Sequence, residues 1–288
     1  MTNTNDIKFV FFGTPTRAVT TLEILKENGF LPQLIVTQPD SKKGRGYITQ
    51  KSEVKTWAEI NEIKVLDPEQ LSLDFKDLLL QESWDLFVVV AYGKLLPNWL
   101  LEIPKHGAIN IHYSLLPLYR GATPVETQIL NGARETGVSI MLIDEKMDHG
   151  PIISQEVISM PDPLPTNNEL VEVLSALGGS LLSETIPEWV AGNIEAQPQE
   201  HQYATLTKKF NKKEAEINLE ANPNLNFRKI QAFNTWPRAH FFANGKDGKS
   251  IRIVITKAHL EDGKLILEKV IPEGKKEVEW GDFKRGLG

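Results

Sequence analysis

The sequence predicts an α/β protein in two parts: a doubly wound, mostly parallel Rossmann-like sheet and a small, mainly β C-terminal domain, barrel-like and reduced. Apolar runs of strand length alternate with helical patterns over the first 150 residues. Asp85–Tyr92 is a continuous, valine-rich run, typical of a strand that is buried on both faces. The composition changes after residue 193, which predicts the second part.

The apolar runs that we expect to be strands are short and end near turn residues. They are Lys8–Phe12, Leu34–Thr37, Asp85–Tyr92, Ala108–His112 and Gly137–Ile143. Helical patterns between them cover Thr16–Asn28, Val54–Asn61, Phe75–Gln81 and Val125–Asn131. Because strand–helix–strand connections are right-handed, this alternation predicts parallel strands with helices on both faces.

The remaining chain predicts one long helix, a linker and a β-rich end. The helix is expected over 167–191, interrupted near Gly178–Gly179 and Pro187, and the linker over 194–207, where apolar residues are few. We then expect a helix at Asn224–Phe233, strands at Arg238–Ala243, Ile251–Ala258 and Lys264–Val270, and turns at Asn244-Gly245 and Asp262-Gly263. The expected domains are therefore 1–193 (catalytic) and 208–288, joined by 194–207.

Composition limits the class of protein. Of 288 residues, 41% are hydrophobic and 24% charged, which is ordinary for globular domains. Cysteine is absent, which excludes disulfides, cysteine nucleophiles and thiolate metal sites. The N-terminus is polar, and no apolar run approaches the roughly 18–20 residues that cross a bilayer. We expect a cytoplasmic protein that has no membrane partner and is a monomer.

Charge is unevenly distributed along the chain. The net charge of −6 argues against indiscriminate binding to nucleic acid, but residues 1–200 carry −12 and residues 201–288 carry +6. A basic C-terminal third can mark a module that binds polyanions, or it can be a solvated, lysine-rich surface.

Several common chemical motifs are missing. The sequence contains neither G-x-G-x-x-G nor G-x-x-x-x-G-K-[ST], and it has no G-x-S-x-G elbow. Its six histidines do not have the spacing of metal ligands, so no metal is expected.

Three polar residues gather near strand ends. Asn110 and His112 are two apart at the end of an expected strand, so their side chains point to the same side. Asp148 lies just past the next expected strand, and ligands of open α/β sheets bind at the carboxyl ends of strands. An amide and a protonated imidazole can donate to a developing oxyanion, and a carboxylate can orient the imidazole and move protons. The trio therefore suits acyl transfer to an amine without a covalent intermediate. The plainer alternative is a turn cap, a strand-end histidine and a loop acid.

The residues around the trio form a longer pattern. Asn110-x-His112, Ser114-Leu115-Leu116-Pro117, Arg120-Gly121 and Asp148 with Gly150 resemble the folate-dependent formyltransferases, which share an N-x-H…SLLP…D signature. Further matches make the likeness strongest to the branch of that family that acts on methionyl-tRNA. They are Phe12–Pro15, Thr37–Asp40, Gly44–Gly46, Val88–Gly93, Glu135–Val138 and Ala232–Pro237. The likeness covers nearly the whole chain.

The resemblance implies transfer of a formyl group from 10-formyltetrahydrofolate, a cosubstrate, to the α-amino group of methionine on initiator tRNA. It implies that Asn110, His112 and Asp148 are catalytic and that Ser114, Leu115, Leu116 and Pro117 belong to the folate site. Gly93, Lys94, Leu95 and Leu96 fall where related enzymes line the pterin pocket. An apolar strand leading into a loop also suits a flat pterin.

Two basic clusters are candidates for binding tRNA. Lys42, Lys43 and Arg45 lie in a glycine-containing segment after the second expected strand, where a cationic loop could grip the acceptor stem through phosphates. Lys208 and Lys209 form a second cluster at the entry to the C-terminal domain. Each cluster could instead be a solvated charged surface.

Two residues depart from the family pattern. Tyr113 stands where a small residue or proline is usual, so it could stack on a ligand or narrow the crevice, and Arg17 stands where an aromatic is expected. The rival readings are a folate-dependent enzyme that formylates an amino-sugar nucleotide or glycinamide ribonucleotide, a hydrolase of 10-formyltetrahydrofolate, and a catalytically dead RNA-binding protein. The basic segments and the intact trio argue against the first and the last.

Overall fold

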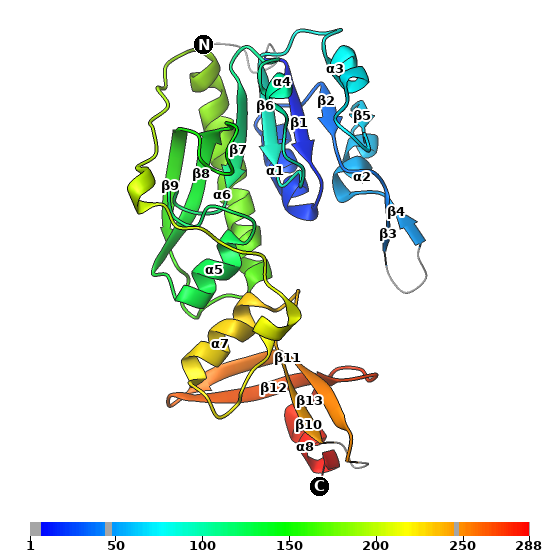
Figure 1. Ribbon diagram of the computed structural model, residues 1–288, viewed down its shortest axis with the longest axis vertical. Coiled ribbons are helices and arrows are strands. Elements are labelled where there is room, and N and C mark those ends of the chain that lie inside the picture. The colour runs from blue at the N-terminus through cyan, green and yellow to red at the C-terminus, as the bar shows by residue number, and fades with distance from the viewer. Residues whose placement is uncertain (1–6, 44–47, 245–247, 288) are drawn as a thin grey trace. The chain divides into compact units, whose positions relative to one another are not determined.

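The computed structural model describes residues 7–43, 48–244 and 248–287. The chain divides into two compact units (Figure 1). The first contains residues up to 120 together with 137–158 and 172–206, and the second contains 121–136, 159–171 and 207–288. The domain bounds expected from the sequence, 1–193 and 208–288 with a linker at 194–207, stay a prediction.

The first unit is built on a seven-stranded sheet in the order β5-β2-β1-β6-β7-β8-β9. The strands are β1 (Phe9–Gly13), β2 (Leu34–Val36), β5 (Val65–Leu66), β6 (Leu86–Val90), β7 (Ala108–His112), β8 (Glu135–Leu142) and β9 (Ile152–Ser159). The first five in spatial order pair in parallel, as expected. The predicted mostly parallel α/β fold is therefore confirmed.

Alternate side chains of the central strands face two helical layers. Val10 and Phe12 of β1 lie in one buried cluster with Phe75 and Leu79 of α3 (Leu73–Leu79) and Leu100 of α4 (Asn98–Leu101). The other layer contains α1 (Thr16–Glu27), α2 (Glu53–Ile60) and α6 (Asn167–Val190), where the Trp57 indole of α2 donates to Glu23 of α1 and Gly179 of α6 approaches Ile24 of α1. The continuous apolar runs of β1 and β6 therefore reflect burial on both faces.

Helix α6 is continuous through the two glycines at which an interruption was expected. A β-carbon on Gly178 would lie 2.9 Å from the Ile111 side chain, and one on Gly179 would lie 3.0 Å from Ile24 of α1. These glycines let α6 approach β7 and α1 closely, so they serve packing and do not break the helix.

Strand β8 differs from the expected parallel arrangement because it pairs antiparallel with β7. His112 lies opposite Ser139, and Ile109 lies opposite Leu142. The end of β8 is therefore beside the start of β7, and the loop of residues 143–150 must return toward His112. Four further features were not predicted: β5, β9, α4 and the hairpin of β3 (Ser41–Lys43) and β4 (Ile48–Gln50).

The second unit contains α5 (Pro124–Asn131), α7 (Pro223–Ala232) and a four-stranded antiparallel sheet. Its strands are β10 (His240–Asn244), β11 (Ser250–Glu261), β12 (Lys264–Pro272) and β13 (Val278–Glu279), followed by α8 (Trp280–Leu287). The β11–β12 turn at Asp262-Gly263 is confirmed, with both residues at positive φ as a tight hairpin requires. Gly245 of the other expected turn lies outside the described residues. Within the described part of the chain, no helix is long and apolar enough to span a membrane.

Candidate active site

The structure brings His112 and Asp148 together. His112 ends β7 and is 6% exposed, and its Nδ1 lies 3.7 Å from Oδ1 of Asp148. Asn110, two residues earlier on β7, is half-buried, and among the described residues no hydrogen-bond partner of its side chain is found. The strand pleat directs Asn110 and His112 to the same side of the sheet.

A backbone carbonyl fixes the orientation of the His112 ring. Nε2 of His112 lies 3.0 Å from the carbonyl oxygen of Tyr119. A carbonyl only accepts hydrogen bonds, so this contact assigns the hydrogen of the neutral ring to Nε2. Nδ1 is then the atom that faces Asp148 and can exchange a proton with a ligand.

Two residues that sequence analysis did not assign hold the Asp148 loop. The Gln199 amide donates to the carbonyls of Asp148, at 3.1 Å, and of Gly150, at 2.7 Å. The Arg120 guanidinium donates to the Gln199 side-chain oxygen from Nε and Nη2. Burial lowers the pKa of Arg120, while the nearby carboxylates of Asp148 and Asp144 oppose that shift. Arg120 belongs to the quoted family pattern, but no local signal in the sequence marks Gln199.

The Ser114–Pro117 segment forms a bonded turn just beyond β7. Ser114 donates to the carbonyl of Leu118, at 2.6 Å, and its own carbonyl accepts from Ser139 of β8. The Gln155 amide of β9 donates to the carbonyl of Leu116. The expected folate-site turn is thus fixed to the two strands that follow it in the sheet.

The segment Gly93–Leu96 follows β6 and presents its residues differently. Leu95 is 78% exposed, whereas Leu96 packs against the buried cluster beneath the sheet. The Lys94 ammonium donates to the backbone carbonyls of Pro68 and Glu69, at 2.9 and 2.8 Å. Lys94 therefore ties this segment to the one that follows β5, and Leu95 is its exposed leucine.

Polar contacts join the ends of β1, β2 and β6. The Tyr92 carbonyl accepts from the Thr14 hydroxyl, at 3.0 Å, and from the Gln38 amide, at 3.1 Å. The same tyrosine ring is buried against Phe12, and burial raises the pKa of Tyr92 to about 12. The family motifs at 12–15 and 37–40 therefore fix the carboxyl edge of the sheet.

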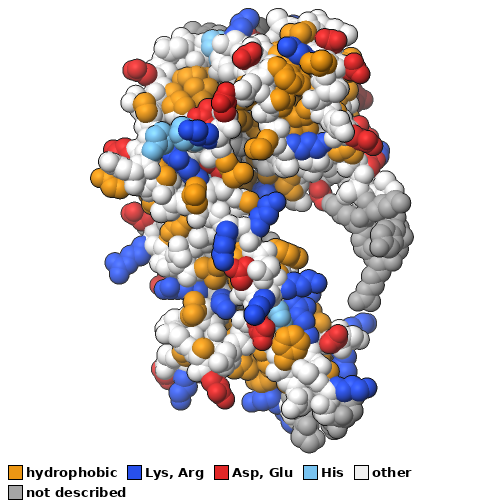
Figure 2. Space-filling model, in the orientation of Figure 1, with side chains coloured by type: hydrophobic (Ala, Val, Ile, Leu, Met, Phe, Trp, Pro, Cys, Tyr) orange, Lys and Arg blue, Asp and Glu red, His pale blue; other side chains and the backbone are white. Residues whose placement is uncertain are grey.

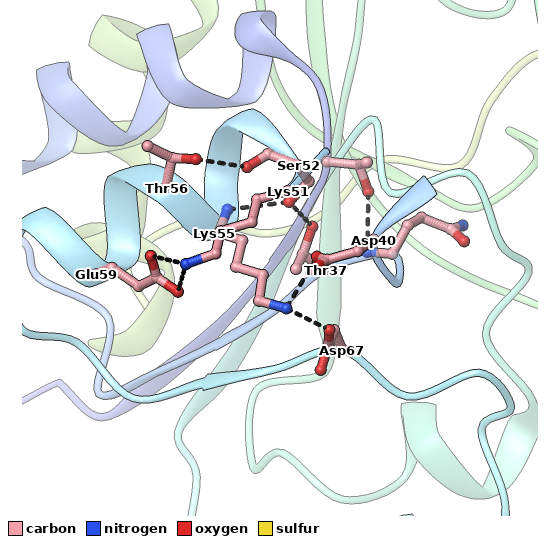
Figure 3. A network of polar contacts seen from close by, with 10 residues as sticks. Thr37, Asp40, Lys51, Ser52, Lys55, Thr56, Glu59 and Asp67 are labelled. Carbon is pink, nitrogen blue, oxygen red and sulfur yellow. Dashed lines mark hydrogen bonds and ion pairs between the residues drawn. The ribbon is translucent and has the colours of Figure 1, made fainter. Parts of the chain in front are cut away.

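The base of the β3–β4 hairpin is anchored by ion pairs (Figure 3). Lys55 of α2 contacts Asp40, at 2.9 Å, and Asp67, at 2.7 Å, while Lys51 contacts Glu59. The hydrogen bonds and charges of Asp67 and Asp40 raise the pKa of Lys55. Ser52 caps α2 and bonds to Thr37 at the end of β2.

The predicted RNA-binding cations fall in different places. Lys42 and Lys43 lie in strand β3, and Arg45 lies outside the described residues. Lys208 forms an ion pair with Glu214 but its side chain is 75% exposed, and Lys209 is exposed. Figure 2 shows further Lys and Arg side chains over the region of α7 and the four-stranded sheet.

Tyr113 does not face the crevice, contrary to the ligand-stacking role considered above. Its hydroxyl accepts a hydrogen bond from Ser175 of α6 and also bonds to Thr21 of α1. Burial raises the pKa of Tyr113, and the charge of Arg17 opposes that rise. The two departures from the family pattern therefore interact with each other behind β7.

The site offers an amide, an imidazole and a carboxylate at one edge of the sheet. Within the described residues, no group of three or more His, Asp or Glu side chains is arranged to hold a metal ion. The chemistry that these side chains can carry out is hydrogen bonding to a carbonyl oxygen and proton transfer.

Comparisons with known proteins show the family of this chain. The family model described as "Formyl transferase" matches residues 7–186. The methionyl-tRNA formyltransferase of Halalkalibacterium halodurans is 38% identical over 84% of this chain and 77% of its own length. That of Listeria monocytogenes is 37% identical over 98% of this chain and 96% of its own length.

Solved structures with a similar fold include formyltransferases. Methionyl-tRNA formyltransferase from Clostridium thermocellum superposes with a TM-score of 0.63 at 16% identity, covering 95% of this chain and 99% of its own. An N-formyltransferase from Helicobacter canadensis, in complex with folinic acid and dTDP-3-aminofucose, has a TM-score of 0.63 at 22% identity, covering 91% and 98%. At these identities the likeness concerns the fold alone. The sequence matches carry the assignment: this chain belongs to the formyl transferase family.

Proposed function

We propose that this protein transfers the formyl group of 10-formyltetrahydrofolate to the α-amino group of methionine on initiator methionyl-tRNA. The observation that carries the proposal is the pairing of His112 with Asp148 beside Asn110. The methionyl-tRNA formyltransferases that match over nearly the full chain support the choice of acceptor. The role of the reaction is to prepare the first amino acid for translation.

Asn110 and His112 stabilise the negative charge of the reaction. The amine nitrogen attacks the formyl carbon, a carbon–nitrogen bond forms, and the carbonyl oxygen becomes negative. The Asn110 amide and a protonated Nδ1 of His112 donate hydrogen bonds to that oxygen. One such donor is typically worth on the order of 10²–10³ in rate.

Asp148 manages the protons of the same step. The attacking amine must lose a proton, and the nitrogen of the departing tetrahydrofolate must gain one as its bond to the formyl carbon breaks. Asp148 accepts the first proton directly or through His112, whose Nδ1 lies 3.7 Å from Oδ1 of Asp148. The 3.7 Å gap between the two side chains is typical of catalytic contacts that tighten when substrate binds.

The residues proposed to bind folate lie in segments that follow strands β6 and β7, and those proposed to bind RNA lie in the β3–β4 hairpin and in the second unit. The turn at Ser114–Pro117 and the exposed apolar Leu95 in Gly93–Leu96 are proposed to hold the folate. Lys42, Lys43 and Arg45 are proposed to contact phosphates of the acceptor stem, and Lys208 and Lys209 to contact the RNA elsewhere.

An amino-sugar nucleotide is the second candidate acceptor, because a structural neighbour was solved with one. That neighbour is 22% identical, whereas the methionyl-tRNA formyltransferase relatives are 37–38% identical over most of the chain. The sequence relationship therefore favours the RNA substrate.

The test is formyl transfer itself. The protein is incubated with 10-formyltetrahydrofolate and either initiator or elongator methionyl-tRNA, and formyl-methionine is measured by mass. We expect product on initiator tRNA. Product on both tRNAs would support the chemistry and remove the initiator specificity. No product on either, with folate bound, would contradict the proposal and favour a small amine acceptor.

A further inference from the structure

The backbone of Asp148 is held in an unusual conformation. Its φ is +49°, in the left-handed region that residues other than glycine rarely adopt. Gly150 is equally constrained, because a β-carbon there would lie 1.9 Å from the Leu142 carbonyl oxygen. A strained loop of this kind persists only when its surroundings hold it in place.

Gln199 bonds to this loop on both sides of the strained region. Its side-chain nitrogen donates to the carbonyls of Asp148 and Gly150, at 3.1 and 2.7 Å, and its oxygen accepts from Nε and Nη2 of Arg120, at 3.0 and 2.5 Å. Gln199 is 5% exposed, so water cannot easily replace these bonds.

The orientation of the Gln199 amide is chemically determined. A guanidinium only donates hydrogen bonds and a backbone carbonyl only accepts them. The oxygen must therefore face Arg120 and the nitrogen must face the loop. Glutamine is the residue that meets both demands here; glutamate matches Arg120 but places an oxygen against two carbonyl oxygens.

We propose that Gln199 is a positioning residue for Asp148. Its side chain bridges Arg120 to the Asp148 and Gly150 carbonyls, and so holds the loop with the Asp148 carboxylate facing Nδ1 of His112. The inference rests on the proposed function, because it needs Asp148 to act in the reaction. It assigns a role in catalysis to a segment, 194–207, that the sequence indicates only as a linker.

The test compares three single substitutions. Gln199→Met keeps the size of the side chain and removes all four bonds, whereas Gln199→Glu keeps the contact with Arg120 and loses both donors. Gln197→Met is the matched control, because that side chain is exposed and its amide bonds to the Glu195 carbonyl. We expect both Gln199 variants to lower kcat about 10- to 100-fold, as a misplaced catalytic group does. KM for folate should change less than about twofold in all three variants, and kcat of the Gln197→Met control should also change less than about twofold.

A double-mutant cycle separates positioning from stability. Gln199→Met is combined with Asp148→Asn, and formyl transfer is measured under single-turnover conditions with the folded fraction determined in parallel. If Gln199 acts through Asp148, Gln199→Met lowers the rate of formyl transfer less than about threefold when Asp148→Asn is already present. A full 10- to 100-fold loss in both backgrounds would overturn the inference.

The failures can be told apart. If the unsubstituted protein transfers formyl normally and the losses caused by Gln199→Met and Asp148→Asn are additive, only the positioning role of Gln199 is contradicted. Normal transfer by Asp148→Asn defeats the proposed role of Asp148 and the inference with it. Absence of transfer to any methionyl-tRNA by the unsubstituted protein defeats the proposed function first, and the inference falls as a consequence.

Discussion

The carboxyl end of strand β7, around His112, and the hairpin β3–β4 belong to the same unit but are held in different ways. Near the carboxyl end of β7, the side chains of His112, Ser114 and Gln199 are buried, and each bonds to a backbone carbonyl. The hairpin is anchored at its base, where Lys55 joins Asp40 to Asp67 (Figure 3).

The difference follows from what each region is proposed to do. A reacting carbonyl needs hydrogen-bond donors that are fixed before the substrate arrives, because moving the donors into place during the reaction would cost part of the free energy by which they stabilise the transition state. Phosphates of an RNA backbone are recognised by charge, which acts over several ångströms and tolerates movement. Buried hydrogen bonds suit the first task, and charged side chains on a hairpin that is anchored at its base suit the second.

The largest expected effect on activity is that of substituting His112 at the end of β7. His112→Ala removes the oxyanion donor and the partner of Asp148, so kcat should fall by at least about 10². Folate binding, measured by fluorescence titration, should change little, since the turn at Ser114–Pro117 is held by its own bonds. A variant that keeps near-normal turnover would show that the edge is not the catalytic centre.

Removing the hairpin charges should have an intermediate effect. We expect Lys42→Ala with Lys43→Ala to raise KM for methionyl-tRNA about tenfold at low salt, with little change in kcat. The dependence of log KM on log salt should become less steep by up to about 2, one for each lost phosphate contact. An unchanged salt dependence would mean that these lysines do not contact phosphate.

The anchor of the hairpin can be tested with a matched pair of lysines. Lys55→Met removes the ion pairs with Asp40 and Asp67 and leaves those carboxylates uncompensated, so we expect KM for tRNA to rise about threefold. Lys51→Met removes an exposed pair with Glu59 and should change KM less. Equal effects of the two variants would contradict a positioning role for Lys55.

The pH dependence of the Lys55 anchor has a defined sign. The folded-state pKa of Lys55 is raised above 10.5, so its contribution to stability is complete below 10.5 and is lost as pH rises through the higher value. Between pH 6 and 9 the effect of Lys55→Met on KM should therefore be constant. A loss of the effect within this range would mean that the anchor depends on another group.

The smallest effect is expected in the second unit. Lys208 already pairs with Glu214, and both Lys208 and Lys209 are exposed. Lys208→Ala with Lys209→Ala should raise KM for tRNA about two- to threefold at low salt and change the salt dependence less than the hairpin pair does. A larger effect than that of Lys42 and Lys43 would reverse the comparison and place the main electrostatic contact in the second unit.

The sequence determined the parallel half of the sheet, whereas the catalytic role of the trio stays a prediction. Alternating apolar runs and helices are local patterns, so β1, β2, β6, β7 and the helices between them were predicted within a few residues. Asn110 and His112 share a side of the sheet because the pleat alone requires it. Asp148 was added because it lies just past the next expected strand, and the N-x-H…SLLP…D pattern then included it.

Only the tertiary structure decided how Asp148 reaches His112. Strand β8 runs antiparallel to β7, so the loop carrying Asp148 returns from the opposite edge, and no local pattern encodes that reversal. Gln199 contacts Asp148 across 51 positions of sequence, and its segment looks like a linker because its apolar residues are few. Local periodicity reports which face of an element is buried, whereas contacts between distant segments depend on how the whole chain packs.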